Sequence, residues 1–344
     1  MSYDALLARS WNDNQLGSVL IELTYRCNLD CFFCYNDLGL RGKPLTFEQY
    51  ADCLRDLASM NVLNVTLSGG EPLAHPDFFR IGALGRDLGF VMRVKSNGHA
   101  LRGELARRLR DEVDPFIIEV SLHGARAETH DRQTRVAGSF TRLVDNLREM
   151  IALGLRVKVN STLTVWNEGE VAEMYALCDE LGLPLRFDLQ VSPRDDGDRT
   201  PLNVAPTAEG IRGLIAVQDA QAARFAANAE RDPDPPKETA ARVKVTKHCG
   251  AGSSGIAIDP YGNIYPCVQW RRSVANLHET RISAIWGTAF DEFRRETEEA
   301  AGVVAAHPHG KLLNFCPGLA EVLTGSATRV PEEMERVAAV IATA

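Results

Sequence analysis

The chain has 344 residues and a net charge of −8, from 38 Lys and Arg against 46 Asp and Glu. This length predicts about two domains, and the acidic balance argues against a nucleic-acid partner, which would need a basic stripe. No apolar stretch approaches the ~20 residues of a membrane span, and residues 1–15 carry charges throughout, with no apolar signal segment. The composition therefore predicts a cytoplasmic protein with neither a membrane nor a nucleic-acid partner.

From about residue 18 to residue 191, a short strand followed by an amphipathic helix repeats along the chain. The expected strands are rich in β-branched and aromatic residues: 19–24, 62–68, 90–96, 116–122, 155–164 and 185–191. The expected helices lie between them, several with capping residues or terminal glycines: 46–60, 77–88, 101–112, 139–153 and 167–181. This alternation predicts an α/β fold with a parallel sheet. Six units favour a partial (β/α)6 barrel of the TIM type, with an open doubly wound sheet as the alternative.

The expected strands alternate between apolar and polar residues. Strands of a parallel sheet covered on both faces are instead almost continuously apolar. The polar positions share one phase: Glu22, Arg93, Lys95, Glu119, Lys158, Asp188 and Gln190. Because branched apolar side chains fill the interior of an ordinary closed barrel, we interpret this face as the lining of a lumen that holds a ligand. A solvated open face is the alternative.

The remainder of the chain differs in composition. Residues 207–228 are Ala-rich and helical in pattern, 231–237 read as a linker, and 259–262 (Asp-Pro-Tyr-Gly) predict a hairpin turn. We expect five parts: an N-terminal segment (1–17), the barrel (18–200), a helical linker (201–245), a small loop-rich module (246–325) and a C-terminal helix (326–344). A loop-rich module of this size usually needs a metal centre to hold it together.

Eight cysteines are unevenly distributed, and in a reducing compartment clustered cysteines indicate metal binding or catalysis. One group directly follows the first expected strand: Cys27, Cys31 and Cys34. A second group lies in the last third of the chain: Cys249, Cys267 and Cys316. The other two stand alone in helical patterns, where we expect small buried side chains, with a hydrogen-donating thiol as the alternative: Cys53 and Cys178.

The first group has the spacing C-x₃-C-x₂-C and can hold three corners of a metal centre. Structural zinc sites need a fourth protein ligand, and no fourth ligand lies nearby in the sequence. Thiolates are also the usual ligands of [4Fe–4S] clusters, and three of them leave one iron open. Ligands bind where the strands of such barrels end, so the expected site is a catalytic [4Fe–4S] cluster, with a zinc knuckle or buried thiols as the alternatives.

This cysteine run resembles the signature of the radical SAM superfamily, and segments at the following strand ends match that family as well. The matching segments include Ser68-Gly69-Gly70-Glu71-Pro72, Lys95-Ser96-Asn97-Gly98 and Ser121-Leu122-His123-Gly124. The resemblance implies that the open iron chelates S-adenosylmethionine (SAM), whose reductive cleavage yields a 5′-deoxyadenosyl radical. It implies that Cys27, Cys31 and Cys34 hold the catalytic cluster.

The resemblance also implies a set of SAM contacts. The glycines after the second strand would let the backbone approach the methionine amino group, and Arg132 or Arg135 would join Ser121 at the SAM carboxylate. His123 stands where relatives carry Asp, and is expected to be either an acid–base group or a structural histidine. The implied SAM-binding residues are Phe33, Ser68, Gly69, Gly70, Glu71, Ser96, Asn97, Ser121, Arg132, Arg135, Asn160, Gln190 and Val191.

The second cysteine group resembles the SPASM/twitch extension of the same superfamily. Full SPASM domains carry seven cysteines, whereas this sequence has three, with His307, Gly310 and Ala320 at positions where relatives have cysteine. The resemblance implies either one auxiliary Fe–S cluster or a degenerate module without metal, and we favour the cluster. Cys249, Cys267 and Cys316 would hold it, completed by His307, His309, a backbone group, water or substrate.

The resemblance implies radical chemistry on a ribosomally synthesised peptide, giving a crosslink, an epimerised residue or an oxidation. About 17 residues precede the first strand, so a fused leader-binding domain is not expected. The alternatives are the same chemistry on a small molecule, such as a sugar or an antibiotic or cofactor precursor, and a non-catalytic Fe–S electron carrier or sensor. The implied partners are therefore a peptide or small-molecule substrate and an electron donor of the flavodoxin or ferredoxin type.

Overall fold

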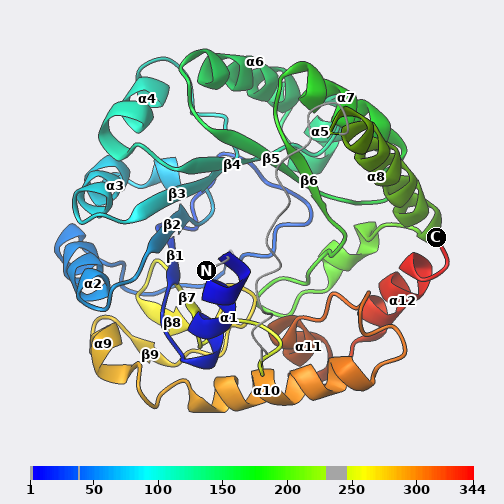
Figure 1. Ribbon diagram of the computed structural model, residues 1–344. Helices are drawn as coiled ribbons and strands as arrows, with labels where there is room; N and C mark the ends of the chain where they lie inside the picture. The colour runs from blue at the N-terminus through cyan, green and yellow to red at the C-terminus, as the bar shows by residue number, and fades with distance from the viewer. Residues whose placement is uncertain (1–2, 38, 230–245) are drawn as a thin grey trace.

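The computed structural model describes residues 3–37, 39–229 and 246–344, and its strands form one curved sheet with helices around its outside (Figure 1). The order is β6-β5-β4-β3-β2-β1-β7-β8-β9, so β6 and β9 are its edges and the barrel is open and partial. The strands are β1 Ser18–Glu22, β2 Asn64–Ser68, β3 Val91–Ser96, β4 Ile117–Ser121, β5 Val157–Thr162, β6 Leu185–Asp188, β7 Gly255–Ile258, β8 Asn263–Tyr265 and β9 Ala275–Asn276.

Helices follow most of the strands of the barrel. The α-helices are α1 Tyr3–Asn12, α2 Phe47–Ser59, α3 Phe78–Asp87, α4 Gly103–Arg108, α5 Ala127–Thr134, α6 Ser139–Ala152, α7 Val171–Glu180, α8 Ala208–Ala229, α9 Ile282–Ile285, α10 Asp291–Ala306, α11 Pro317–Thr324 and α12 Glu332–Ile341. The short helical turns are η1 Pro72–Ala74, η2 Leu109–Val113, η3 Glu168–Glu170 and η4 Thr200–Val204.

The capping box and the hairpin turn that the sequence predicted are both present. Thr46 and Gln49 form the predicted capping box at the start of α2. Between β7 and β8, the backbone N–H of Gly262 donates to the carbonyl of Asp259, and Gly262 has φ +84°. Only glycine adopts that conformation without steric cost, so the turn predicted at 259–262 is confirmed.

Several helical regions differ from the expectation: α1, α10 and α11 lie where no helix was predicted, although 246–325 was expected to be loop-rich, and two regions of the barrel differ as well. The single helix expected at 101–112 is α4 followed by the π-helical turn η2. The helix α5 was not predicted, because it carries no apolar stripe: the side chains that it buries are those of His130, Gln133 and Thr134. Hydrophobic periodicity cannot find a helix that is anchored by polar contacts.

The strands alternate as expected, with apolar side chains packed outward against the helices. Val19, Ile21, Val65, Leu67 and Val94 are all almost completely buried. They form one continuous core with α2, α3 and α6. This packing holds the strands in register, so that the carboxyl ends of β1 to β6 meet along one rim.

The second half of the chain completes the same sheet. β7 pairs in parallel with β1, and β8 and β9 continue antiparallel from it. The described part of the expected linker contains α8, which packs on α7, η3 and α12. The rest of the linker, residues 230–245 with the 231–237 segment, lies outside the described residues. The small module is therefore joined to the barrel edge by a β-ladder.

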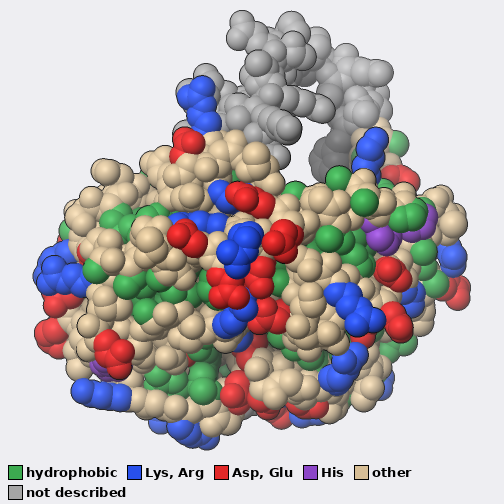
Figure 2. Space-filling model, turned by 90° about the horizontal axis from the view of Figure 1, so that it is seen from below, with side chains coloured by type: hydrophobic (Ala, Val, Ile, Leu, Met, Phe, Trp, Pro, Cys, Tyr) green, Lys and Arg blue, Asp and Glu red, His purple; other side chains and the backbone are tan. Residues whose placement is uncertain are grey.

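The surface mixes charges of both signs. On the face seen in Figure 2, acidic and basic side chains are interspersed, and no continuous basic stripe crosses that face. Among the described residues, none of the helices combines the length and apolarity that crossing a bilayer requires.

Candidate functional site

A cavity of about 870 Å³ lies at the carboxyl ends of the barrel strands. The first cysteine group, the ends of β2 to β6 and part of the C-terminal module all contribute to its wall. Its residues include Cys27, Cys31, Phe33, Cys34, Ser68, Gly69, Gly70, Ser96, Asn97, Ser121, Asn160, Gln190 and Val191, together with Val268, Gln269 and Asn314. The fold thus brings together most of the residues that sequence reasoning assigned to SAM.

The first cysteines line this cavity as free thiols on one loop. Burial, together with the charges on Cys34 and Cys27, raises the pKa of the Cys31 thiol. Cys27 is more exposed and accepts hydrogen bonds from the Leu29 backbone N–H (3.4 Å) and the Asn97 amide (3.6 Å). A cationic iron centre would remove the repulsion between the thiolates. Three free thiols on one loop, with no fourth His, Cys, Asp or Glu grouped with them among the described residues, fit a cluster with one open iron.

Gly69 and Gly70 hold the cysteine loop against the end of β2. The backbone N–H of Gly70 donates to the carbonyl of Thr24 (2.7 Å), and a Cβ on Gly70 would lie 2.6 Å from the carbonyl oxygen of Arg26. Gly69 has φ +135°, and its Cβ would lie 2.3 Å from the Thr24 carbonyl oxygen. We expected these glycines to admit the SAM amino group; their close contact with residues 24–26 is a second and sufficient reason for glycine.

Glu71 does not line the cavity, contrary to its expected role as a SAM contact. Its carboxylate is 2% exposed and accepts hydrogen bonds from the Ser96 hydroxyl (2.9 Å), the Asn97 backbone N–H (2.8 Å) and the Leu73 backbone N–H (3.2 Å). Burial raises its pKa to about 7, against the effect of these donors. Glu71 therefore ties the end of β2 to the end of β3 and positions Ser96 and Asn97.

Arg132 and Arg135 do not line the cavity either. The Arg132 guanidinium lies over the Trp166 ring, 4.2 Å from its centroid, and Arg135 pairs with Asp30 (3.3 Å). Arg132 lies in the last turn of α5 and Arg135 is the residue that ends it, and the sequence did not predict this helix. The cations on the cavity wall are instead Lys95, Lys158 and Arg186.

The predicted polar lining is largely present. Lys95, Glu119, Lys158, Asp188 and Gln190 line the cavity, and Asn160 donates to Glu119 (2.8 Å). Of the remaining two polar positions, Arg93 pairs with Glu119 (2.7 Å) without reaching the wall, and Glu22 is fully buried. Arg186 also lines the cavity, although the sequence analysis did not name it. It lies two residues before Asp188, and residues two apart on a strand face the same side, so this spacing would have predicted it.

His123 follows the end of β4 by two residues and lines the cavity beside Phe33. The two rings meet edge to face with centroids 4.8 Å apart. Burial and the nearby charge of His130 lower the pKa of His123 to about 3, and its Nδ1 has no partner among the described residues. A ring held neutral in this way presents a polar, uncharged group to the cavity.

The second cysteine group converges behind the hairpin. Burial, with the charges on Cys267 and Cys249, raises the pKa of Cys316 to about 12. Gly318, two residues after Cys316, is packed so closely on the backbone after Cys267 that a Cβ would lie 2.5 Å from the Gln269 carbonyl oxygen. The start of α11 therefore brings Cys316 near Cys267. Together with Cys249, these half-buried cysteines make three thiols that fit an Fe–S cluster.

His307, one of the alternatives for the fourth ligand, follows the end of α10, where it faces Glu335 (3.7 Å) and His309. The histidine beside the cysteines is His248, whose Nε2 lies 2.8 Å from the carbonyl oxygen of Phe315. His248 directly precedes Cys249 in the sequence, and this position could have predicted that it lies beside the cysteines. Among the described residues, no three His, Cys, Asp or Glu side chains lie close enough together to chelate a single metal ion.

A buried ion cluster joins this module to the barrel. The Arg271 guanidinium donates to both oxygens of Glu22 (2.8 and 2.9 Å) and lies 2.9 Å from Asp195. Tyr25 also donates to Glu22 (3.1 Å), and the Asp195 backbone N–H donates to the Tyr35 carbonyl (2.8 Å). These contacts connect the sequence around Cys34 with the sequence around Cys267.

The two isolated cysteines lie away from the cavity wall. Cys53 in α2 and Cys178 in α7 are buried in the hydrophobic core, and burial raises both pKa values to about 12. Neither thiol reaches the cavity. Their structure agrees with small apolar core residues and gives no support to a hydrogen-donating role.

Comparison with known proteins agrees with this arrangement. Residues 21–178 match the model of the radical SAM superfamily, and residues 249–304 match the SPASM model, described as an iron–sulfur cluster-binding domain. Solved structures share the fold: anSMEcpe with bound AdoMet has a TM-score of 0.69 at 14% identity, covering 95% of each chain. Streptococcus suis SuiB has a TM-score of 0.64 at 17% identity, covering 82% of this chain and 68% of that one.

Three curated relatives show the range of similarity. The mycofactocin maturase MftC of Mycobacterium ulcerans is 32% identical over 250 residues, 72% of this chain and 66% of that protein. The AdoMet-dependent heme synthase of Methanosarcina barkeri is 26% identical, over 88% of this chain and 92% of that protein. The PqqA peptide cyclase of Streptomyces rochei is 30% identical, over 81% and 78%. The chain therefore belongs to the radical SAM superfamily and carries a C-terminal SPASM iron–sulfur domain.

Proposed function

We propose that this protein cleaves SAM reductively and uses the resulting radical to modify a ribosomally synthesised peptide. The observation that carries the proposal is the single cavity whose wall combines the first cysteine loop, the polar strand ends and residues of the SPASM domain. A substrate in this cavity would contact both the first cysteine loop and residues next to the second cysteine group, such as Gln269 and Asn314. Such an arrangement suits an enzyme better than an electron carrier, which needs no substrate cavity.

In the proposed mechanism, Cys27, Cys31 and Cys34 hold the cluster through their thiolates. The bound cluster and SAM supply the radical chemistry, and the chain's own residues bind, orient and exclude water. The proposed SAM contacts are those expected residues that line the cavity: Phe33, Ser68, Gly69, Gly70, Ser96, Asn97, Ser121, Asn160, Gln190 and Val191.

Two parts of the expected SAM site are replaced in this proposal. Glu71 acts as a positioning residue, because its carboxylate holds Ser96 and Asn97 in place and faces away from the cavity. For the SAM carboxylate, Lys158 and Arg186 are better placed than Arg132 or Arg135, since only the first pair lines the cavity.

The auxiliary cluster is proposed to bind at Cys249, Cys267 and Cys316. Gln269 and Asn314 each lie two residues from one of these cysteines and line the cavity. A cluster held there by these three cysteines would supply one-electron redox chemistry next to the cavity. The electron that starts the reaction would come from a flavodoxin- or ferredoxin-type donor.

The peptide class is supported by the relatives named a maturase and a peptide cyclase. A second candidate, the same chemistry on a small molecule, is favoured by the heme synthase, because that alignment covers 92% of the relative's length. Both candidates share the SAM step and differ only in what occupies the substrate part of the cavity.

The SAM step is tested by measuring 5′-deoxyadenosine from anaerobic, cluster-loaded enzyme under strong reduction. The variant Cys27→Ala should form none, while Cys53→Ala, which removes a buried core thiol, should keep the activity. Full activity of Cys27→Ala would refute the proposed SAM chemistry.

The substrate class is tested by co-expressing the enzyme in heavy water with a short peptide encoded beside its gene and weighing the peptide. Loss of two hydrogens indicates a crosslink or a dehydrogenation, and uptake of one deuterium indicates epimerisation. An unchanged peptide, with deoxyadenosine still formed, would favour the small-molecule candidate.

A further inference from the structure

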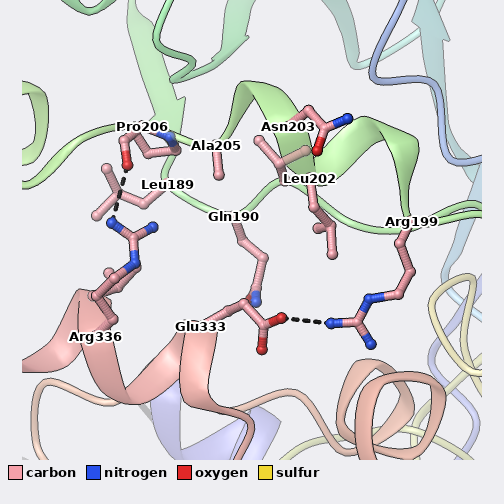
Figure 3. A pocket seen from close by; sticks show the side chains of 11 residues that line it. Leu189, Gln190, Arg199, Leu202, Asn203, Ala205, Pro206, Glu333 and Arg336 are labelled. Atoms are coloured by element: carbon pink, nitrogen blue, oxygen red, sulfur yellow. Dashed lines mark hydrogen bonds and ion pairs between the residues drawn. The ribbon is translucent and has the colours of Figure 1, made fainter.

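A second pocket, of about 380 Å³, adjoins the main cavity. It lies between the chain after β6, the η4 turn and the C-terminal helix α12 (Figure 3). Leu189, Gln190 and Val191 form part of the wall of both cavities. Apart from Gln190 and Val191, which also line the main cavity, none of the expected SAM contacts lines this pocket.

The walls of this second pocket combine an aliphatic lining with two guanidinium groups. Leu189, Val191, Leu202, Pro206 and Val337 supply the apolar surface. Arg199 and Arg336 are its cations and Glu333 its single carboxylate, so the ionised side chains sum to one positive charge. This local excess is opposite in sign to the net charge of the whole chain.

The guanidinium groups of the two arginines differ in the partners that they already have. Arg199 pairs with Glu333 (2.8 Å), a half-exposed ion pair of the kind that contributes little stability. Among the described residues, Arg336 has one hydrogen-bond partner, the Pro206 carbonyl oxygen (3.2 Å), and no carboxylate. A guanidinium has five N–H donors in a planar fork that matches a carboxylate, so Arg336 keeps donors for an anion.

We infer that this pocket is a subsite for a substrate carboxylate that has aliphatic groups beside it, and that Arg336 is the main residue that binds this carboxylate. The inference rests on the proposed function, since it names the chemistry of that substrate. The carboxylate comes either from the C-terminus of a peptide or from an Asp or Glu side chain. Because the shared segment 189–191 spans at most about 10 Å, the anchored residue lies within a few positions of the modified one.

The test measures binding by saturation-transfer NMR on the cluster-loaded protein with SAM bound, so it does not depend on turnover. The probes are N-acetyl-leucine, N-acetyl-leucinamide and the amidated dipeptide acetyl-Leu-Asp. We expect at least one carboxylate probe to bind about tenfold or more tightly than the uncharged amide, as a charge-assisted hydrogen bond provides. The tighter of the two carboxylate probes identifies the source of the carboxylate.

Three variants assign the binding to this pocket. Arg336→Met should weaken the carboxylate probe about tenfold or more, whereas Arg212→Met, at an exposed position of α8 outside the pocket, should leave it unchanged. Glu333→Gln should strengthen binding, because it removes the one carboxylate of the pocket wall and frees Arg199 from its ion pair. Equal affinity for acid and amide, or wild-type affinity in Arg336→Met, would overturn the inference while leaving the SAM step untouched.

Discussion

The buried ion cluster gives the sharpest quantitative prediction. In the variant Arg271→Met, Glu22 and Asp195 lose the cation that faces both of them. The side chains of Arg271, Glu22 and Asp195 are 10%, 0% and 15% exposed, so solvent cannot replace the lost partner. Removing one member of a buried ion pair costs about 3–5 kcal/mol, and we expect the free energy of unfolding to fall by that amount.

The measurement is urea unfolding followed by tryptophan fluorescence, for which the neighbouring Trp270, 1% exposed, is a built-in reporter. The matched control is Arg126→Met, which breaks an exposed ion pair with Glu173 and should cost less than about 1 kcal/mol. Adding Glu22→Gln and Asp195→Asn to Arg271→Met should recover at least half of the loss, since the buried charges are then gone. A cost of Arg271→Met below about 1 kcal/mol, or no recovery in the triple variant, would refute the reasoning.

Three further outcomes are expected. Gly70→Ala should lose about 2–3 kcal/mol of stability from overpacking against the Arg26 carbonyl, whereas Gly213→Ala, in an open position on α8, should gain up to about 1 kcal/mol by thermal unfolding. Folded Glu71 keeps its proton up to about pH 7, whereas the unfolded chain loses it near pH 4.5. The free energy of unfolding should therefore fall by about 3 kcal/mol as the pH rises from 4.5 to 7. Glu71→Gln should remove most of this pH dependence, and an unchanged pH dependence would contradict the raised pKa of Glu71. Cys316→Ala should leave 5′-deoxyadenosine formation intact and remove the modified product by mass spectrometry; a surviving product would show that the auxiliary cluster is dispensable.

The sequence by itself determined the features that depend on neighbours along the chain. The spacing of Cys27, Cys31 and Cys34, the glycine pair after β2 and the alternation of the strands are local, and they located the sheet, the cavity rim and most of its lining. Strand alternation has a period of two, so the facing of a residue such as Lys158 follows from its position alone.

Only the tertiary structure decided which partners distant residues meet. Arg271 and Glu22 are 249 positions apart, and they pair because β7 joins the sheet beside β1. Arg132 was expected at the SAM carboxylate, but α5 forms through polar anchors that no hydrophobic pattern predicts, and it turns that side chain onto Trp166. Contacts of this kind are set by packing across the fold, and local sequence signals do not encode them.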